Sequence, residues 1–403
     1  MKICAIICEY NPFHNGHRYQ LSEIRRLSGC DKILCVMSGN FTQRGEPAVF
    51  NKYVRARHAV ACGADAVIEL PTAFAVSPAE LFARGAVHIL SSIPAVEKLA
   101  FGCESGTKES FLAAAKATLT EDKQFKTALK ENMKDGTSYI RARNEALLSM
   151  NADVDESLLS SPNNLLGTEY CRALLLKGKP IEPLPIQRVG GGYADTALFK
   201  DFSSATALRA ALEQDGGIAR NSGVTRKTQK ALKRNMPEFV YREHLSYRPL
   251  PYEKATLCAL LRASADEIAA CPDCSEGLEN RLVAMTRSNP DYDDMLKKVV
   301  SKRYTLSRLK RILMQNFLGI RLKDVRNYAE TPLYCKTLAV KKTEAEEILA
   351  ELSKGGFPAI VRKSDYSLLK KDAVPCFETD LRANELYAAL SGNYANPYET
   401  LFV

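Results

Sequence analysis

A short apolar run that leads directly into a glycine-containing turn opens this chain, and it restricts the fold more than any other segment. The run Ile3–Cys8 has the length of a buried strand, and residues 15–28 have the apolar spacing of an amphipathic helix. The turn between them, residues 9–17, reads Glu-Tyr-Asn-Pro-Phe-His-Asn-Gly-His. A helix start presents unpaired N–H groups and the positive end of the helix dipole, and Gly16 lets an anion approach closely. The segment therefore predicts a strand–turn–helix unit that binds phosphate.

Two of the five histidines of the chain, His14 and His17, lie in this turn. At a spacing of three residues they project from the same side of the helix start, toward the expected anion. A single histidine at such a position is usually a cap or a satisfied surface group, and a zinc site of the His-x-x-His type is another alternative. Because no third ligand follows at a fixed spacing nearby, the pattern favours the phosphate site.

Residues 1 to about 105 alternate apolar runs with helical patterns, which is typical of a parallel sheet covered by helices on both faces. The predicted strands are Ile3–Cys8, Lys32–Met37, Ala66–Leu70 and Val96–Phe101, and the predicted helices lie near 15–28, 47–62 and 78–92. The expected fold class is therefore α/β, a Rossmann-like doubly wound parallel sheet. Ligands of such sheets bind beyond the carboxyl ends of the strands.

Four later segments carry residues that suit the same edge. The loop 38–47 and the turn at Gly102 contain glycines for close backbone approach. A predicted strand over 183–189 places Arg188 before a glycine-rich loop, where its guanidinium would suit a phosphate. Residues 203–209 form a hydroxyl-rich helix start with an arginine. We expect these segments to converge on the anion site.

The helix expected after the loop 38–47 has a basic face that contains Lys52, Arg55 and Arg57. Such a face is usually solvated. Lys52 and Arg57 are nevertheless candidates for a contact with a substrate.

The blocks around these sites resemble a known family. A strand followed by His-Asn-Gly-His at a helix start resembles the nucleotidyltransferase branch of the HIGH-motif superfamily. Residues 9–17, Gly-Asn-Phe-Thr-Gln-Arg-Gly-Glu-Pro-Ala at 39–48, Asp-Ala-Val-Ile-Glu-Leu-Pro at 65–71 and Ser-Pro-Asn-Asn at 161–164 are similar to the bacterial tRNA(Met) cytidine acetate ligase family. Residues 204–209 resemble the second motif of the superfamily, Ser-Ser-Thr-x-Ile-Arg, and depart from it by one alanine and a leucine.

The resemblance spans most of the chain in separate blocks and implies roles for particular residues. The implied catalytic residues are His14, His17 and Arg209. The expected ATP contacts are Ile7, Cys8, Glu9, Tyr10, Asn11, Pro12, Phe13, His14, Asn15, Gly16, His17, Arg18, Tyr19, Gln20, Gly102, Asn163, Arg188, Val189, Ser204 and Thr206. The expected contacts with substrate or tRNA are Gln43, Arg44, Lys302, Arg303, Arg308 and Arg311. No dedicated metal site is expected, although Mg²⁺ would suit the triphosphate, with Glu9 and Glu104 as candidate ligands.

The positive charge of the chain is concentrated in its C-terminal half. The net charge is +9, yet residues 220–245 carry seven Lys or Arg against two Glu, and residues 297–326 carry ten against one Asp, so the remainder sums to −5. Tyr304, Phe317 and Tyr328 lie among these cations, and basic residues with aromatics suit phosphates and unpaired bases. A solvated helix face over an apolar core is the alternative.

Length and composition bound the organisation of the chain. At 403 residues we expect about two or three domains. We divide it into a nucleotidyltransferase-like ATP-binding domain over 1–215, with a helical insertion at about 107–160, and a basic, mainly helical RNA-binding domain over 216–403 that ends in a small α/β element. No apolar run is long enough to span a membrane, and no signal-type segment opens the chain, so we expect a cytoplasmic protein.

The twelve cysteines are scattered through apolar patterns, as expected for reduced thiols in the cytosol. Cys271-Pro272-Asp273-Cys274 is the exception, and it reads as a loop with two thiols in preference to half a zinc site or a redox pair.

The resemblance implies a ligase that activates acetate with ATP to acetyl-adenylate and acetylates N4 of the wobble cytidine of elongator tRNA(Met). Two alternatives remain open at this stage. One is an adenylyltransferase that acts on a small phosphorylated metabolite, and the other is a non-catalytic RNA-binding protein. The basic C-terminal half argues against the first, and the intact histidines argue against the second. The sequence leaves the oligomeric state open.

Overall fold

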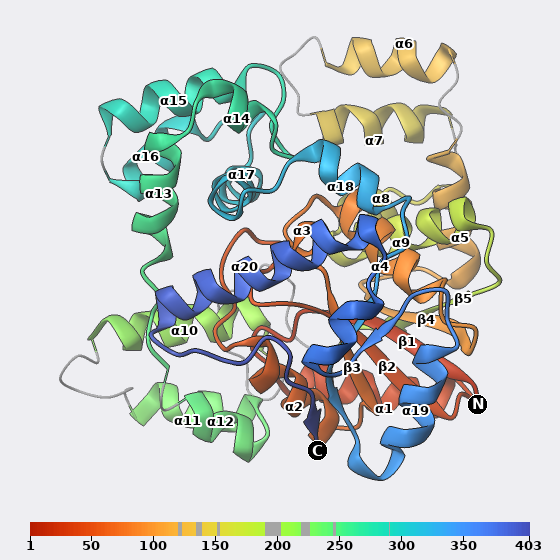
Figure 1. Ribbon diagram of the computed structural model, residues 1–403. Coiled ribbons are helices and arrows are strands. Elements are labelled where there is room, and N and C mark those ends of the chain that lie inside the picture. The colour runs from red at the N-terminus through yellow and green to blue at the C-terminus, as the bar shows by residue number, and fades with distance from the viewer. Residues whose placement is uncertain are drawn as a thin grey trace.

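The computed structural model describes residues 1–119, 123–133, 139–150, 154–189, 203–218, 226–244, 247–289 and 291–403. Its centre is one mostly parallel sheet with the strand order β5-β4-β1-β2-β3-β6-β7, in which β8 pairs with β6 (Figure 1). The strands are β1 (Ile3–Cys8), β2 (Lys32–Ser38), β3 (Ala66–Leu70), β4 (Val96–Cys103), β5 (Glu182–Gln187), β6 (Cys335–Val340), β7 (Ala359–Ile360) and β8 (Leu401–Phe402). The α/β class and the first four strands are thereby confirmed.

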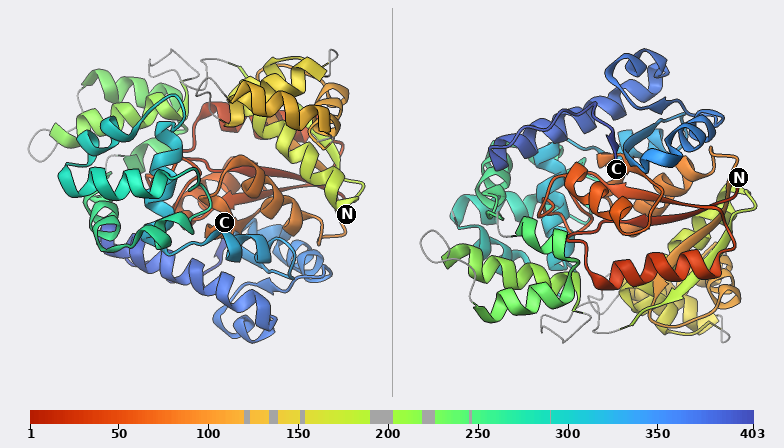
Figure 2. Two further views of the ribbon diagram at one scale, coloured as in Figure 1. Left: turned by 90° about the horizontal axis from the view of Figure 1, so that it is seen from above. Right: turned by 90° about the horizontal axis from the view of Figure 1, so that it is seen from below.

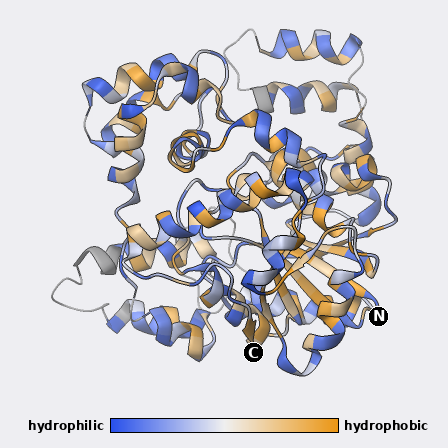
Figure 3. Cartoon of the chain, viewed as in Figure 1, coloured by the Kyte–Doolittle hydropathy of each residue, from blue (hydrophilic) through white to orange (hydrophobic). Residues whose placement is uncertain are grey.

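Helices cover both faces of the sheet because side chains alternate along each strand. On one face Cys4 and Ile6 share a core with α1 (Asn15–Leu27), α2 (Lys52–Ala61) and α10 (Ala205–Ile218). On the other face Ala5 and Ile7 share a core with α3 (Thr72–Ala75), α4 (Ala79–Leu90), α5 (Lys108–Ala117) and α9 (Pro162–Lys177). The hydropathy colouring of Figure 3 shows the strands between these layers as mainly hydrophobic.

Two expectations about this region need correction. The helix expected near 47–62 begins at Lys52, because the Asn51 side chain accepts hydrogen bonds from the N–H groups of Tyr53 and Val54 and so caps the helix there. The sheet is also not wholly parallel, because β6 runs antiparallel to β3. An antiparallel strand beside a parallel sheet is common in large α/β proteins. The α/β segment expected after residue 330 therefore continues the sheet of the N-terminal part.

Helices lie on both sides of the sheet (Figure 2), and one group of them comes from the segment between β4 and β5. The segment that follows β4 supplies α5, α6 (Lys123–Asn132), α7 (Tyr139–Met150) and α8 (Ser157–Ser160) before α9 returns to β5, as the predicted insertion requires. Phe125, Ala146, Leu147 and Leu159 form a small core of this region.

The C-terminal half is helical up to residue 328. Its helices are α11 (Arg226–Asn235), α12 (Glu238–His244), α13 (Tyr252–Arg262), α14 (Ala265–Ala269), α15 (Leu278–Ser288), α16 (Tyr292–Val299), α17 (Leu306–Leu318) and α18 (Leu322–Tyr328). The group α13–α17 has its own core, which includes Leu257, Leu282, Met295 and Leu313. Then α19 (Ala345–Ser353) and α20 (Val374–Ser391) pack on the sheet region. None of the helices in the described ranges is long and apolar enough to cross a membrane.

Candidate functional site

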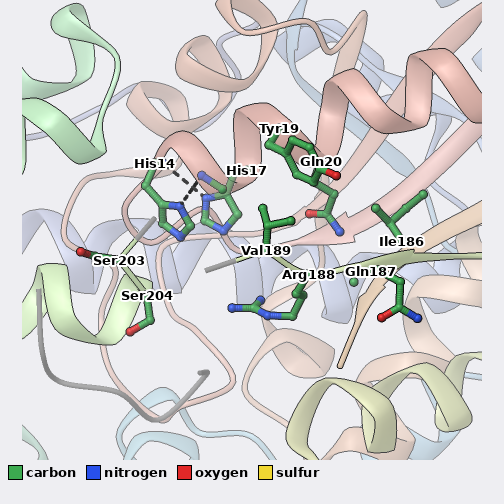
Figure 4. Close-up of a pocket in the computed structure, with 12 residues that line it drawn as sticks. His14, His17, Tyr19, Gln20, Ile186, Gln187, Arg188, Val189, Ser203 and Ser204 are labelled. Carbon is green, nitrogen blue, oxygen red and sulfur yellow. Dashed lines mark hydrogen bonds between the residues drawn. The ribbon is translucent and has the colours of Figure 1, made fainter. Parts of the chain in front are cut away.

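The two histidines of the first turn are held by the backbone of α1. The Nδ1 atom of His14 accepts a hydrogen bond from the N–H of Gly16 at 3.0 Å, and the Nδ1 atom of His17 accepts one from the N–H of His14 at 3.3 Å. The imidazole rings stack with their centroids 3.7 Å apart (Figure 4). Because both donors are backbone N–H groups, each neutral ring carries its proton on Nε2. The helix start thus presents two imidazole Nε2–H donors, one from His14 and one from His17, in fixed orientation.

Both rings are held in the neutral form. Burial, and then the charges of Arg188 and Arg209, lower the pKa of His14 to about 3. Burial also lowers the pKa of His17 well below its usual value, and His14 and Arg188 add to this effect. The two rings can therefore offer Nε2–H donors to an anion without carrying a charge of their own.

We expect His14 and His17 to show no protonation between about pH 8 and pH 5 in the ligand-free protein. Imidazole ¹⁵N chemical shifts would report both rings as Nε2–H tautomers throughout, and a titration midpoint near the ordinary value of 6.5 would contradict the assignment. The unfolded chain binds more protons than the folded protein below that pH. The stability contributed by these neutral rings is therefore present above pH 6.5 and declines as the pH falls toward about 3.

A cavity that is partly open to solvent lies beside the histidines, and it holds about 460 Å³ of space when the solvent at its mouth is included. It is lined by His14, Gly16, His17, Tyr19, Gln20, Gly102, Ile186, Gln187, Arg188, Val189, Ser203 and Ser204. These residues come from the turn after β1 and the first turns of α1, the carboxyl ends of β4 and β5, and the start of α10. The order of the strands reverses between β1 and β4, and doubly wound sheets bind their ligands at such a point. Figure 4 shows His14, Arg188 and Ser204 around this space.

Nine of the lining residues are among the expected ATP contacts, whereas Ile186, Gln187 and Ser203 lie in the predicted segments but were not among those contacts. Ile186 and Gln187 directly precede Arg188 in the strand that was predicted there. Their place at the carboxyl end of that strand was the signal that could have identified them as lining residues. The N–H of Ser203 donates to the side chain of Asn235 at 2.7 Å, and the Asn15 side chain donates to the carbonyl of Arg234 at 2.7 Å. The end of α11 therefore supports both the histidine turn and the start of α10, which no local pattern indicated.

Several expected ATP contacts lie around the cavity without lining it. Tyr10 and Phe13 are buried, and their rings pack against His17 with centroids 4.9 and 5.6 Å away. The Asn163 side chain donates to Glu104 at 2.5 Å, at the start of α9. Thr206 accepts hydrogen bonds from Arg44 at 3.0 Å and from Arg209 at 3.4 Å. Direct ATP contacts of these residues stay predictions.

Arg209 reaches the histidine turn from the second turn of α10. Its side chain is buried, and its Nη1 donates to the carbonyl oxygen of Asn11 at 2.6 Å. This bond ties α10 to the segment that precedes His14. The guanidinium therefore adds positive charge beside His14 while it fixes the turn.

The basic face expected on α2 is wrong for two of its three residues. Lys52 and Glu69 form an ion pair at 2.7 Å in which each side chain is 2% exposed. Arg55 is fully buried and donates to the carbonyl oxygens of Glu9 at 2.5 Å and Ser38 at 3.1 Å. These residues hold the loop after β2 and are no solvated face. The third, Arg57, pairs with Glu243 of α12.

The basic residues expected to bind RNA differ from one another in how far they are exposed to solvent. Lys302 is exposed, whereas Arg308 and Arg311 are largely buried and hold the loop at Asp273. Arg311 donates to both carboxylate oxygens of Asp273, at 2.8 and 2.9 Å, and Arg308 donates to its carbonyl oxygen at 2.9 Å. The Cys-x-x-Cys loop is thus fixed through Asp273, and its two cysteines are free thiols.

Of the three aromatics expected to stack on bases, Tyr328 is only 7% exposed and belongs to the core, which corrects that expectation. Phe317 packs against the same core from a partly buried position. Tyr304 is also partly buried, with Arg308 over its ring at 5.5 Å.

No group of three or more histidine, cysteine or acidic side chains that could hold a metal occurs in the described parts of the chain. Glu9 and Glu104, the candidate Mg²⁺ ligands, accept hydrogen bonds from backbone N–H groups. Glu9 accepts from Gln43 at 2.7 Å, and Glu104 accepts from Asn164 at 3.0 Å.

Known proteins resemble the chain over its full length. The family model of the HIGH Nucleotidyl Transferase matches residues 1–400. The tRNA(Met) cytidine acetate ligase of Caldanaerobacter subterraneus subsp. tengcongensis is 37% identical over 98% of this chain and 97% of its own length. That of Clostridium botulinum strain Langeland is 32% identical over 98% and 95%. Thermotoga maritima TmcAL, 29% identical over 100% of both chains, matches with TM-scores of 0.89 for the apo crystal structure and 0.86 for the crystal structure bound with alpha-thio ATP.

Proposed function

The chain belongs to the tRNA(Met) cytidine acetate ligase family of HIGH nucleotidyl transferases, and from that premise we propose that it acetylates the wobble cytidine of elongator tRNA(Met) with acetate and ATP. The observation that carries the proposal is the pair of neutral histidines with fixed Nε2–H donors at the cavity. Together with Arg188 they suit the phosphates of a nucleotide, because preorganised donors stabilise charge that develops in a transition state.

In the first step an oxygen of acetate attacks the α-phosphorus of ATP. The new P–O bond forms acetyl-adenylate, the bond between the α-phosphorus and the bridging oxygen breaks, and pyrophosphate leaves with its electrons. Positioning and charge stabilisation carry such a transfer, so no nucleophilic side chain is needed. His14, His17, Arg188 and Arg209 would stabilise the negative charge on the phosphates, and Mg²⁺ would bind with the triphosphate.

In the second step the exocyclic amine of the cytidine attacks the activated carbonyl. The C–N bond forms, AMP leaves, and the amine loses a proton, which gives N4-acetylcytidine. The base has to be unpaired to reach the adenylate, and an anticodon base meets that condition. The basic helix α11 and exposed cations of the basic segment 297–326, such as Lys302, would supply the surface for tRNA.

Incubation of the protein with labelled acetate, ATP and unmodified tRNA(Met) tests this function. We expect label in N4-acetylcytidine and equimolar release of AMP and pyrophosphate. Transfer of AMP to a small phosphorylated metabolite would instead support a plain adenylyltransferase. Binding of tRNA without turnover would support a non-catalytic RNA-binding protein, and either result would overturn the proposal.

A further inference from the structure

A polar cluster adjoins the histidine turn where the loop after β2 meets the start of α10. We call it the amide–arginine cluster, and it consists of Glu9, Asn11, Gln43, Arg44, Thr206 and Arg209. Its contacts are the bond from the Gln43 N–H to Glu9 at 2.7 Å, that from Arg44 to Thr206 at 3.0 Å and that from Arg209 to the Asn11 carbonyl at 2.6 Å. Thr206 lies two residues after Ser204, which lines the cavity. The cluster and the cavity are therefore neighbours.

Two amide groups of the cluster are buried without an acceptor. Asn11 is 3% exposed, and its Oδ1 accepts a hydrogen bond from the N–H of Val49 at 2.8 Å. That backbone donor fixes the orientation of the amide, so its NH₂ group must point elsewhere. Neither Nδ2 of Asn11 nor Nε2 of Gln43 has a hydrogen-bond partner within the described part of the chain. Buried donors that lack an acceptor cost free energy, and a bound acceptor would relieve that cost.

The charges of the cluster favour an anion as that acceptor. Arg44 and Arg209 contribute two guanidinium groups, and Glu9 contributes one carboxylate, whose Oε1 is already engaged by the N–H of Gln43. A small carboxylate combines negative charge with acceptor oxygens for two amide donors. A cation or an apolar group would leave both amide donors unpaired.

We propose that Asn11 and Gln43 bind the carboxylate of acetate through their side-chain NH₂ groups, with Arg44 and Arg209 supplying positive charge. This assignment rests on the proposed function. It places acetate on the loop side of the histidine turn and the nucleotide in the cavity on the other side, so that the two reactants meet at His14 and Arg209. Arg55, which donates to the carbonyl oxygens of Glu9 and Ser38, fixes the start of the loop that carries Gln43.

Two isosteric variants, Asn11→Asp and Gln43→Glu, test the subsite. Each replaces the NH₂ group by a carboxylate oxygen, and Asn11→Asp keeps the acceptor that the N–H of Val49 requires. We expect the KM for acetate in acetate-dependent ATP–pyrophosphate exchange to rise by about tenfold or more, because a donor is lost and a like charge is gained. In Gln43→Glu, at a residue that is not among the expected ATP contacts, ATP affinity without acetate, measured by calorimetry, should stay within about twofold. Gln124→Glu, an exposed position on α6, is the matched control.

The outcomes separate the subsite from the function. An unchanged KM for acetate in the folded Gln43→Glu protein would overturn the subsite even if Asn11→Asp failed to fold. A parallel loss of ATP affinity would also overturn it, because the amides would then belong to the nucleotide site. If the unaltered protein itself shows no acetate-dependent exchange, the proposed function fails and the acetate subsite fails with it.

Discussion

Replacement of His17 by alanine should lower acetate-dependent ATP–pyrophosphate exchange by about 100- to 1,000-fold, the usual effect of removing one preorganised donor to a developing charge. The His17 ring lines the cavity, and its Nδ1 is occupied by the N–H of His14, so Nε2–H is the group available to a phosphate. The affinity of the His17→Ala protein for tRNA should stay nearly unchanged, because the His17 ring does not support the basic surface that is expected to bind tRNA. Exchange assays and filter binding on the same preparations would measure both.

A matched control is His88→Ala on α4, whose ring lies outside the cavity and contacts the carbonyl oxygen of Thr331 at 2.8 Å. We expect its exchange rate to stay within about a factor of two. Full exchange activity in the folded His17→Ala protein would refute the role given to the histidine pair. An equal loss in both variants would show that the effect is one of general stability.

Replacement of Glu69 by glutamine should reduce the free energy of unfolding by about 3–5 kcal/mol, because it leaves a buried lysine charge without its partner. Lys52 contacts both oxygens of Glu69, at 2.7 and 2.8 Å, and neither side chain reaches solvent appreciably. The loop after β2 lies directly on this pair, since a Cβ atom at Gly39 would stand 2.4 Å from an oxygen of Glu69. The variant should therefore also disturb the loop that carries Gln43 and Arg44.

Urea unfolding of Glu69→Gln beside Glu145→Gln would test the effect of burial. Glu145 pairs with Arg141 at 2.8 Å on the exposed surface of α7, where loss of the pair should cost no more than about 0.5 kcal/mol. A double variant, Lys52→Met with Glu69→Leu, should recover part of the loss because no uncompensated charge remains. Equal free energies of unfolding for Glu69→Gln and Glu145→Gln would contradict the account of the buried pair.

Local sequence pattern was enough to predict the elements that surround the cavity beside His14 and His17. The strand β1 and the helix α1 lie where apolar spacing placed them, and the turn between them presents both histidines at a helix start. The carboxyl ends of parallel strands meet at one edge, so the sequence assigned Gly102 and Arg188 to the same edge, and both line the cavity. These features depend on short segments and on a topological rule.

The sequence by itself determined the strand–turn–helix unit, the α/β class and the concentration of positive charge. Tertiary structure alone decided what the charged side chains do. Lys52 was a candidate for a substrate contact, and Arg308 and Arg311 were expected to contact tRNA. In the structure Lys52 pairs with Glu69, whereas Asp273 holds Arg308 through its carbonyl oxygen and Arg311 through its carboxylate. Likewise β6 joins β3 across a long stretch of chain. Hydrophobic periodicity records which face of a segment is buried, whereas the partner of a buried charge or an edge strand depends on contacts between distant segments.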